Sequence, residues 1–118
     1  MRRVQLPDQQ ALMGRLQRCD PNEHSAERLF PLMINHLYMG SSEKSGEEIG
    51  EAVIASIKEY LDRMSSQSVR TRMKDALRNF LEGYLLAISW EFTGDAGQEA
   101  LNEAQAYCAS HWSEIAPA

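Results

Sequence analysis

The sequence predicts an all-α fold, a small antiparallel bundle of four to five helices. Helical periodicity dominates, and no segment shows the sustained alternation of apolar and polar residues that marks a strand with a hairpin turn. The connections between the expected helices are short, which favours a bundle. A chain of 118 residues with 43% hydrophobic and 25% charged residues has the size and balance of one globular domain. We therefore expect one helical domain over residues 1–118, with residues 1–7 as a candidate flexible tail.

The first expected helix is short and lies near the start of the chain. It runs from Asp8 to about Arg18, directly after Pro7. Leu12 and Leu16 fall on its inner face. A glycine interrupts this helix, so we expect it to depend on packing against the rest of the domain.

The second expected helix is apolar around nearly its whole circumference. Its sequence, LFPLMINHLYM over residues 29–39, follows candidate N-caps at Asp20 and Ser25 and is expected to end at Gly40. A helix that is apolar all round must be buried all round. This helix is either the centre of the bundle or packs one face on the core and the other on a second protein. We expect the shared interface, because each helix of a small bundle normally keeps an exposed face.

Two longer amphipathic helices follow. Ser45 and Glu48 have the spacing of a capping box, which predicts a helix from about Gly46 to Met64 with one buried face. Ser68 is expected to cap the next helix, which would be about 25 residues long and carry one main apolar stripe.

The last helical segment begins where that long helix is expected to stop, at Gly94. Thr93 or Asp95 can cap it. Its apolar positions then line up as far as Trp112, so it can cover one side of the bundle.

A second surplus of apolar surface lies on the long helix. Leu86 and Trp90 are one turn apart, opposite the main stripe and near Gly83, which permits close approach of another chain. The alternative is that the first helix or the C-terminal segment covers Trp90. We expect these residues and the apolar second helix to form a homodimer or partner interface, made of Phe30, Met33, Leu37, Met39, Leu86 and Trp90.

The charge of the chain argues against nucleic acid as the main partner. The net charge is −5, so the field of the whole molecule repels phosphate backbones. The chain nevertheless has one basic cluster, at the start of the long expected helix. A turn followed by a basic helix can be a DNA-recognition element. We keep a small DNA-binding regulator as the alternative function, with contacts from Arg70, Arg72, Lys74 and Arg78.

No pattern in the sequence indicates an enzyme, a cofactor or a metal site. Cys19 with His24, and Cys108 with His111, could converge on zinc, but these spacings are not diagnostic of a zinc site. Cys108 and His111 also lack a third orienting residue and lie near a helix C-terminus, which disfavours a thiolate. We expect both cysteines to be buried free thiols, with no catalytic, cofactor-binding or metal-binding residues.

The chain has no membrane or export signal that we can identify. No segment reaches the roughly 20 consecutive apolar residues that a membrane span requires. The start, MRRVQLPDQQ, has two arginines without the apolar region of a signal peptide. We expect a cytoplasmic protein.

A small, acidic, all-helical chain with surplus apolar helix surface and no catalytic constellation resembles the QslA-like quorum-sensing antiactivators. The resemblance covers the length and general character of the chain, including LFPLMINHLYMG and LLAISWEF. It implies a non-enzymatic regulator that binds and inhibits a LuxR-type transcriptional activator. No residue role is carried over, because no motif matches position by position.

Overall fold

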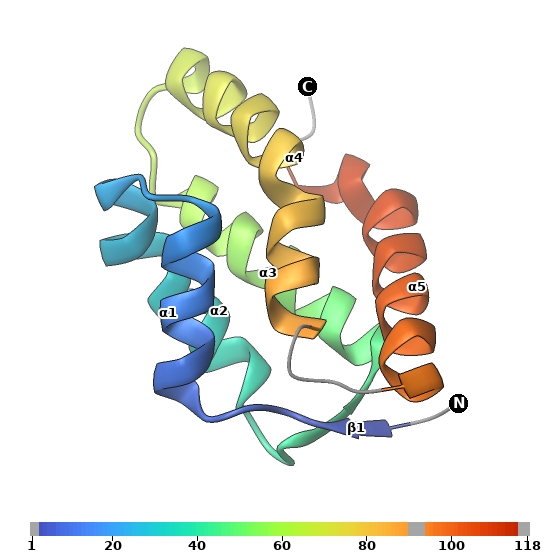
Figure 1. Cartoon of the computed structure of the whole chain (residues 1–118). Coiled ribbons are helices and arrows are strands. Elements are labelled where there is room, and N and C mark those ends of the chain that lie inside the picture. Colours follow the sequence, from blue (N-terminus) through green and yellow to red (C-terminus); the bar gives the residue numbers. More distant parts are fainter. Residues whose placement is uncertain (1–2, 90–93, 116–118) are drawn as a thin grey trace.

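The structure is a computed structural model that describes residues 3–89 and 94–115, and it confirms the all-α fold (Figure 1). None of the helices in these two ranges is long and apolar enough to cross a membrane. The elements, in chain order, are β1 (Arg3–Gln5), α1 (Gln9–Cys19), the π-helical segment η1 (Ser25–Leu29), α2 (Phe30–Leu37), β2 (Glu43–Ser45), α3 (Gly46–Asp62), α4 (Gln67–Ser89), α5 (Gly94–His111) and the 3-10 turn η2 (Trp112–Glu114).

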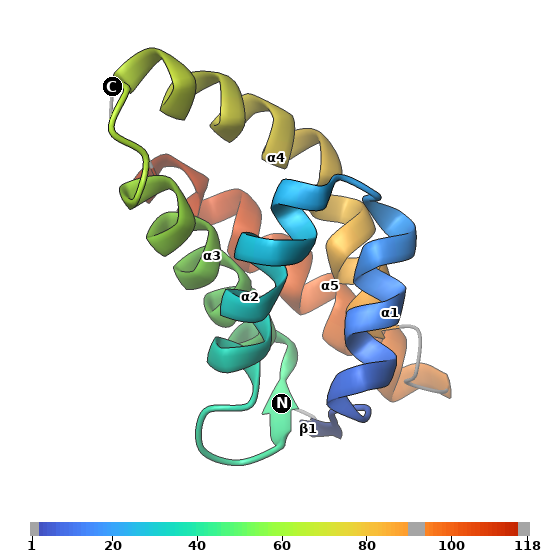
Figure 2. The same ribbon diagram turned by 90° about the vertical axis from the view of Figure 1, so that its left-hand side faces the viewer.

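The apolar second helix is central to the domain. It begins as η1 and continues as α2, which packs against α1 and α3 (Figure 2). The ring of Phe30 also meets the ring of Tyr84 on α4, edge to face, at 5.6 Å between centroids. Phe30, Met33 and Leu37 are each 0% exposed. The prediction that these three residues lie at an interface was therefore wrong, because helices of the same chain surround this short helix.

Residues 3–5, which lie within the expected flexible tail, form a strand. β1 pairs antiparallel with β2, so that Val4 lies opposite Lys44. The side chains of Val4 and Leu6 are buried, and the Leu6 N–H donates to the carbonyl of Ser42 at 2.9 Å. Residues 3–6 thereby cover the lower end of the bundle. The sequence pattern missed this pair because three residues are too few to show an alternation.

The predicted caps position α1 and α3. The carboxylate of Asp8 accepts hydrogen bonds from the N–H groups of Gln10 and Ala11 at the start of α1. Ser45 and Glu48 form the predicted capping box at the start of α3. The Ser45 N–H donates to the Glu48 carboxylate at 3.0 Å, and this bond is the main cause of a lowered pKa of Glu48. Gly40, at φ 77°, follows α2 as expected.

Glycine lets α3 and α5 approach each other closely. A Cβ atom on Gly46 would lie 2.3 Å from the carbonyl oxygen of Ala100, and one on Gly50 would lie 2.9 Å from the Cβ atom of Tyr107. The Sγ atom of Cys108 donates to the Gly50 carbonyl at 3.7 Å. Small residues at this contact therefore bring two backbones together.

The buried residues of α4 all lie from Leu77 onward. Leu77, Tyr84, Leu85 and Ile88 are buried, whereas residues 67–76 include no buried residue and Val69 keeps 38% of its surface exposed. The first half of α4 extends along the top of the domain, away from the other helices (Figure 2).

Both ends of α4 differ from the sequence expectation. The hydroxyl of Ser66, and not that of Ser68, accepts from the first turn, at the N–H of Val69 (3.4 Å). Gly94 opens α5 instead of closing α4. The expected cap Thr93 lies outside the described residues.

Candidate functional site

Two of the residues expected at an interface are exposed, and they lie in different places. Met39 follows α2 and is 66% exposed, and Leu86 on α4 is 44% exposed. Trp90 lies outside the described residues. The predicted interface is therefore reduced, within the described part of the chain, to separate exposed side chains. Leu86 is the one that adjoins a hollow.

The hollow beside Leu86 lies between α1 and the second half of α4, which pack together (Figure 1). We call it the α1–α4 groove; its volume is about 400 Å3, and it is lined by Arg15, Arg18, Cys19, Gly83, Leu86 and Ala87. A Cβ atom on Gly83 would come within 3.5 Å of the Cys19 sulfur. This is an ordinary van der Waals distance, so α1 and α4 lie close together at Cys19 and Gly83.

The thiol in this groove is not activated. Cys19 is half-buried, so the prediction of a fully buried thiol was wrong for this residue. Burial raises the pKa of the Cys19 thiol, and the neighbouring carboxylate of Asp20 raises it further. Because the thiolate is the nucleophilic form, this environment disfavours Cys19 as a nucleophile.

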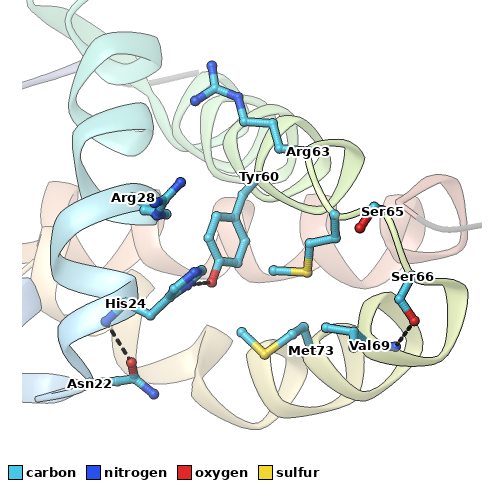
Figure 3. A pocket seen from close by; sticks show the side chains of 10 residues that line it. Asn22, His24, Arg28, Tyr60, Arg63, Ser65, Ser66, Val69 and Met73 are labelled. Atoms are coloured by element: carbon cyan, nitrogen blue, oxygen red, sulfur yellow. Dashed lines mark hydrogen bonds between the residues drawn. The ribbon is translucent and has the colours of Figure 1, made fainter.

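A second hollow lies at the other end of α4. We call it the η1–α3–α4 cavity (Figure 3). Its volume is about 440 Å3, and it is lined by Asn22, His24, Arg28, Tyr60, Arg63, Met64, Ser65, Ser66, Val69 and Met73. These residues come from η1 and the residues just before it, from the end of α3 with the connection that follows, and from the first turns of α4. Sequence reasoning did not select them as a group, because three separate segments supply them.

Tyr60 is the centre of this cavity (Figure 3). Its hydroxyl is hydrogen-bonded to Nδ1 of His24, and the two rings meet edge to face at 5.4 Å. Burial raises the pKa of Tyr60, while the guanidinium of Arg28 acts in the opposite direction. Arg63 bonds to Glu59 at 3.3 Å, and Glu59 also bonds to His36 at 3.0 Å. The cavity thus carries cationic side chains around a neutral phenol.

The basic cluster proposed for DNA contact does not form one face free for a ligand. Arg70 donates to the carbonyl of Met64 at 3.0 Å. Arg78 lies over the ring of Trp112, 5.9 Å from its centroid. Lys74 is half-buried and takes part in an interaction of its own, whereas Arg72 is exposed. Three of the four residues therefore have a contact within the fold.

The cysteines and histidines considered for zinc have separate environments. His24 contacts Tyr60, and His111 bonds through Nδ1 to the Tyr107 carbonyl at 2.9 Å. Cys108 is buried, as predicted, and burial raises its pKa to about 12. Across residues 3–89 and 94–115, no three His, Cys, Asp or Glu side chains gather as a metal site.

No family model, curated protein or solved structure shows significant similarity to this chain.

Proposed function

We propose that this chain is a non-enzymatic regulator that binds a protein partner in the α1–α4 groove. The observation that carries the proposal is Leu86, a large apolar side chain that is 44% exposed and lines the hollow between α1 and α4. An exposed leucine next to a concave, mostly apolar surface is the arrangement into which a partner inserts an anchor side chain.

The groove also favours a particular kind of partner. Arg15 and Arg18 of α1 line it, although the chain as a whole carries a net charge of −5. Cationic side chains beside an apolar hollow complement an amphipathic helix with an acidic rim, because unlike charges at the edge of an interface steer association.

We take the candidate partner from the resemblance of the sequence to quorum-sensing antiactivators. A LuxR-type transcriptional activator would be bound through a helix and inhibited because the bound surface is covered. The regulator itself would perform no chemistry in this process. The homodimer expected from the sequence stays a prediction, and a second copy is the competing occupant of the groove.

The test is Leu86→Glu, measured by calorimetric titration against a purified LuxR-type activator. A carboxylate in the groove should weaken binding by about tenfold or more, because it would be desolvated opposite an acidic partner. Phe80→Glu is the matched control, since Phe80 is exposed to a similar degree on another face of α4. Both variants should keep their helical circular dichroism.

Three results would contradict the proposal. Equal loss of affinity in Leu86→Glu and Phe80→Glu would remove the groove as the binding site. A lack of binding by the unsubstituted chain would remove the activator as its partner. If light scattering shows a dimer that Leu86→Glu converts into a monomer, the groove holds a second copy instead.

A further inference from the structure

The η1–α3–α4 cavity has the size and form of a small-molecule site. Its volume of about 440 Å3 falls within the range of about 300–1,000 Å3 that is typical of ligand pockets. Its three walls belong to η1, α3 and α4, so the cavity exists only in the folded chain. η1 is a π-helical turn, a local irregularity that is frequent at functional sites.

The charge around this cavity selects the ligand. Arg28, Arg63 and His24 line it, and none of its ten lining residues is an aspartate or glutamate. Arg63 is paired with Glu59, so Arg28 is the guanidinium that the proposal uses. This local excess of cationic and neutral donor groups occurs in a chain with 17 acidic and 12 basic residues. Guanidinium groups bind carboxylates strongly through charge-assisted hydrogen bonds. The cavity is therefore complementary to an anion.

The cationic side chain of Arg28 and the apolar side chains of α4 lie on different sides of the cavity (Figure 3). Asn22, His24 and Arg28 stand beside the hydroxyl end of Tyr60, while Val69 and Met73 face the cavity from α4 (Figure 3). Val69 is 38% exposed, so its apolar surface is available to a ligand. Methionine adds a side chain that adapts to irregular apolar shapes.

We propose that this cavity binds a small amphipathic carboxylate, with its charged head at Arg28 and His24 and its alkyl or aryl tail against Val69 and Met73. The hydrogen bond between His24 Nδ1 and the Tyr60 hydroxyl holds the imidazole in place, and Nε2 is the ring nitrogen that would meet the carboxylate. The site does not rest on the proposed protein-binding function, because the α1–α4 groove uses a different stretch of α4.

The experiment is a titration of the full chain with sodium decanoate and with 4-phenylbutyrate, followed by calorimetry and by amide chemical shifts in NMR. Saturable binding at one site is expected for at least one probe, with the largest shifts at residues 22–28, 60–66 and 69–73. Arg28→Gln should weaken binding by about tenfold, the effect of losing one charge-assisted contact. Decanol, which has the same tail without the charge, should bind about tenfold more weakly than decanoate.

Lys58→Gln is the matched control, because it removes one positive charge from an exposed residue that lines neither this cavity nor the α1–α4 groove. It should leave the affinity for decanoate unchanged, and so should Leu86→Glu, which tests the protein-binding groove. Arg28 and Lys58 are both exposed, so the two variants are expected to fold, and circular dichroism checks this. The proposal is overturned if neither carboxylate binds, if decanol binds as tightly as decanoate, or if Arg28→Gln and Lys58→Gln have the same affinity.

Discussion

A single buried carboxylate joins the first connection to the core of the domain. Asp20 ends α1 and is 4% exposed, and its carboxylate accepts a hydrogen bond of 2.6 Å from the hydroxyl of Tyr84. The N–H of Asn22 donates to the other carboxylate oxygen at 3.2 Å. Burial, and then the bond to Asp20, raise the pKa of Tyr84 well above its ordinary value. The phenol therefore stays protonated and donates to Asp20 at any physiological pH.

This pair makes a prediction at the residue scale. Tyr84→Phe keeps the packed ring but leaves one oxygen of Asp20 without its donor, so we expect the free energy of unfolding to fall by about 1.5–3 kcal/mol. Urea denaturation followed by circular dichroism measures this change. Tyr107→Phe is the control, since Tyr107 is half-buried and its ring stacks on His111 at 3.9 Å. An equal effect in both variants would show that the bond to Asp20 contributes nothing particular.

At the scale of elements, the close contact between α3 and α5 organises one side of the domain. Ala100 and Ala104 of α5 are buried against α3, where Gly46 and Gly50 supply the space. Gly46 of α3 lies against Ala100 of α5, and Gly50, one turn later, lies against Ala104. The residue numbers therefore rise in the same direction on both helices, so α3 and α5 run in the same direction. This is the relation expected of helices two apart in an up-and-down bundle.

Replacing a glycine in the tight helix contact and a glycine with open space around it should change the free energy of unfolding in opposite directions. Gly46→Ala places a methyl group against the backbone of α5, and this overpacking should lower the free energy of unfolding by about 1–3 kcal/mol. Gly14→Ala adds a methyl group in the middle of α1, where nothing lies within 4 Å, and should raise stability by about 0.5–1 kcal/mol. Thermal unfolding of both variants compares them directly. A stabilised Gly46→Ala variant would mean that α5 can move away from α3 without cost.

At the scale of the whole molecule, the distribution of charge bears on the alternative function. The net charge is −5, and Arg70 and Arg78 make contacts inside the fold. Arg72 and Arg78 are the exposed residues among the four basic residues of α4 proposed for DNA, and Arg78 lies over the ring of Trp112. A recognition helix presents several side chains to one groove of the duplex, and α4 does not have this arrangement.

We therefore expect duplex DNA to bind weakly and without sequence preference. Fluorescence anisotropy at 150 mM salt should give a dissociation constant no tighter than about 10 µM, which is ordinary for non-specific contact. Arg72→Ala should change it little. Nanomolar binding with a steep salt dependence, lost in Arg72→Ala, would restore DNA binding as the function.

The sequence by itself determined which segments are helical and how two of them begin. Asp8, Ser45 and Glu48 cap α1 and α3 as expected, because capping involves residues only two or three positions apart. The single apolar face of α3 was also readable, since its residues recur at the helical period. Leu86 was found as an exposed side chain for the same local reason.

Only the tertiary structure decided which apolar surfaces are covered and which residues meet. α2 is enclosed by its own chain, while the first half of α4 is left exposed, and both outcomes depend on where the neighbouring helices lie. His24 and Tyr60 are 36 positions apart, and Asp20 and Tyr84 are 64 apart. A periodic pattern shows which face of one helix is apolar, but it does not show which other helices pack against that face. These contacts and both hollows therefore depend on how the helices pack in the folded chain.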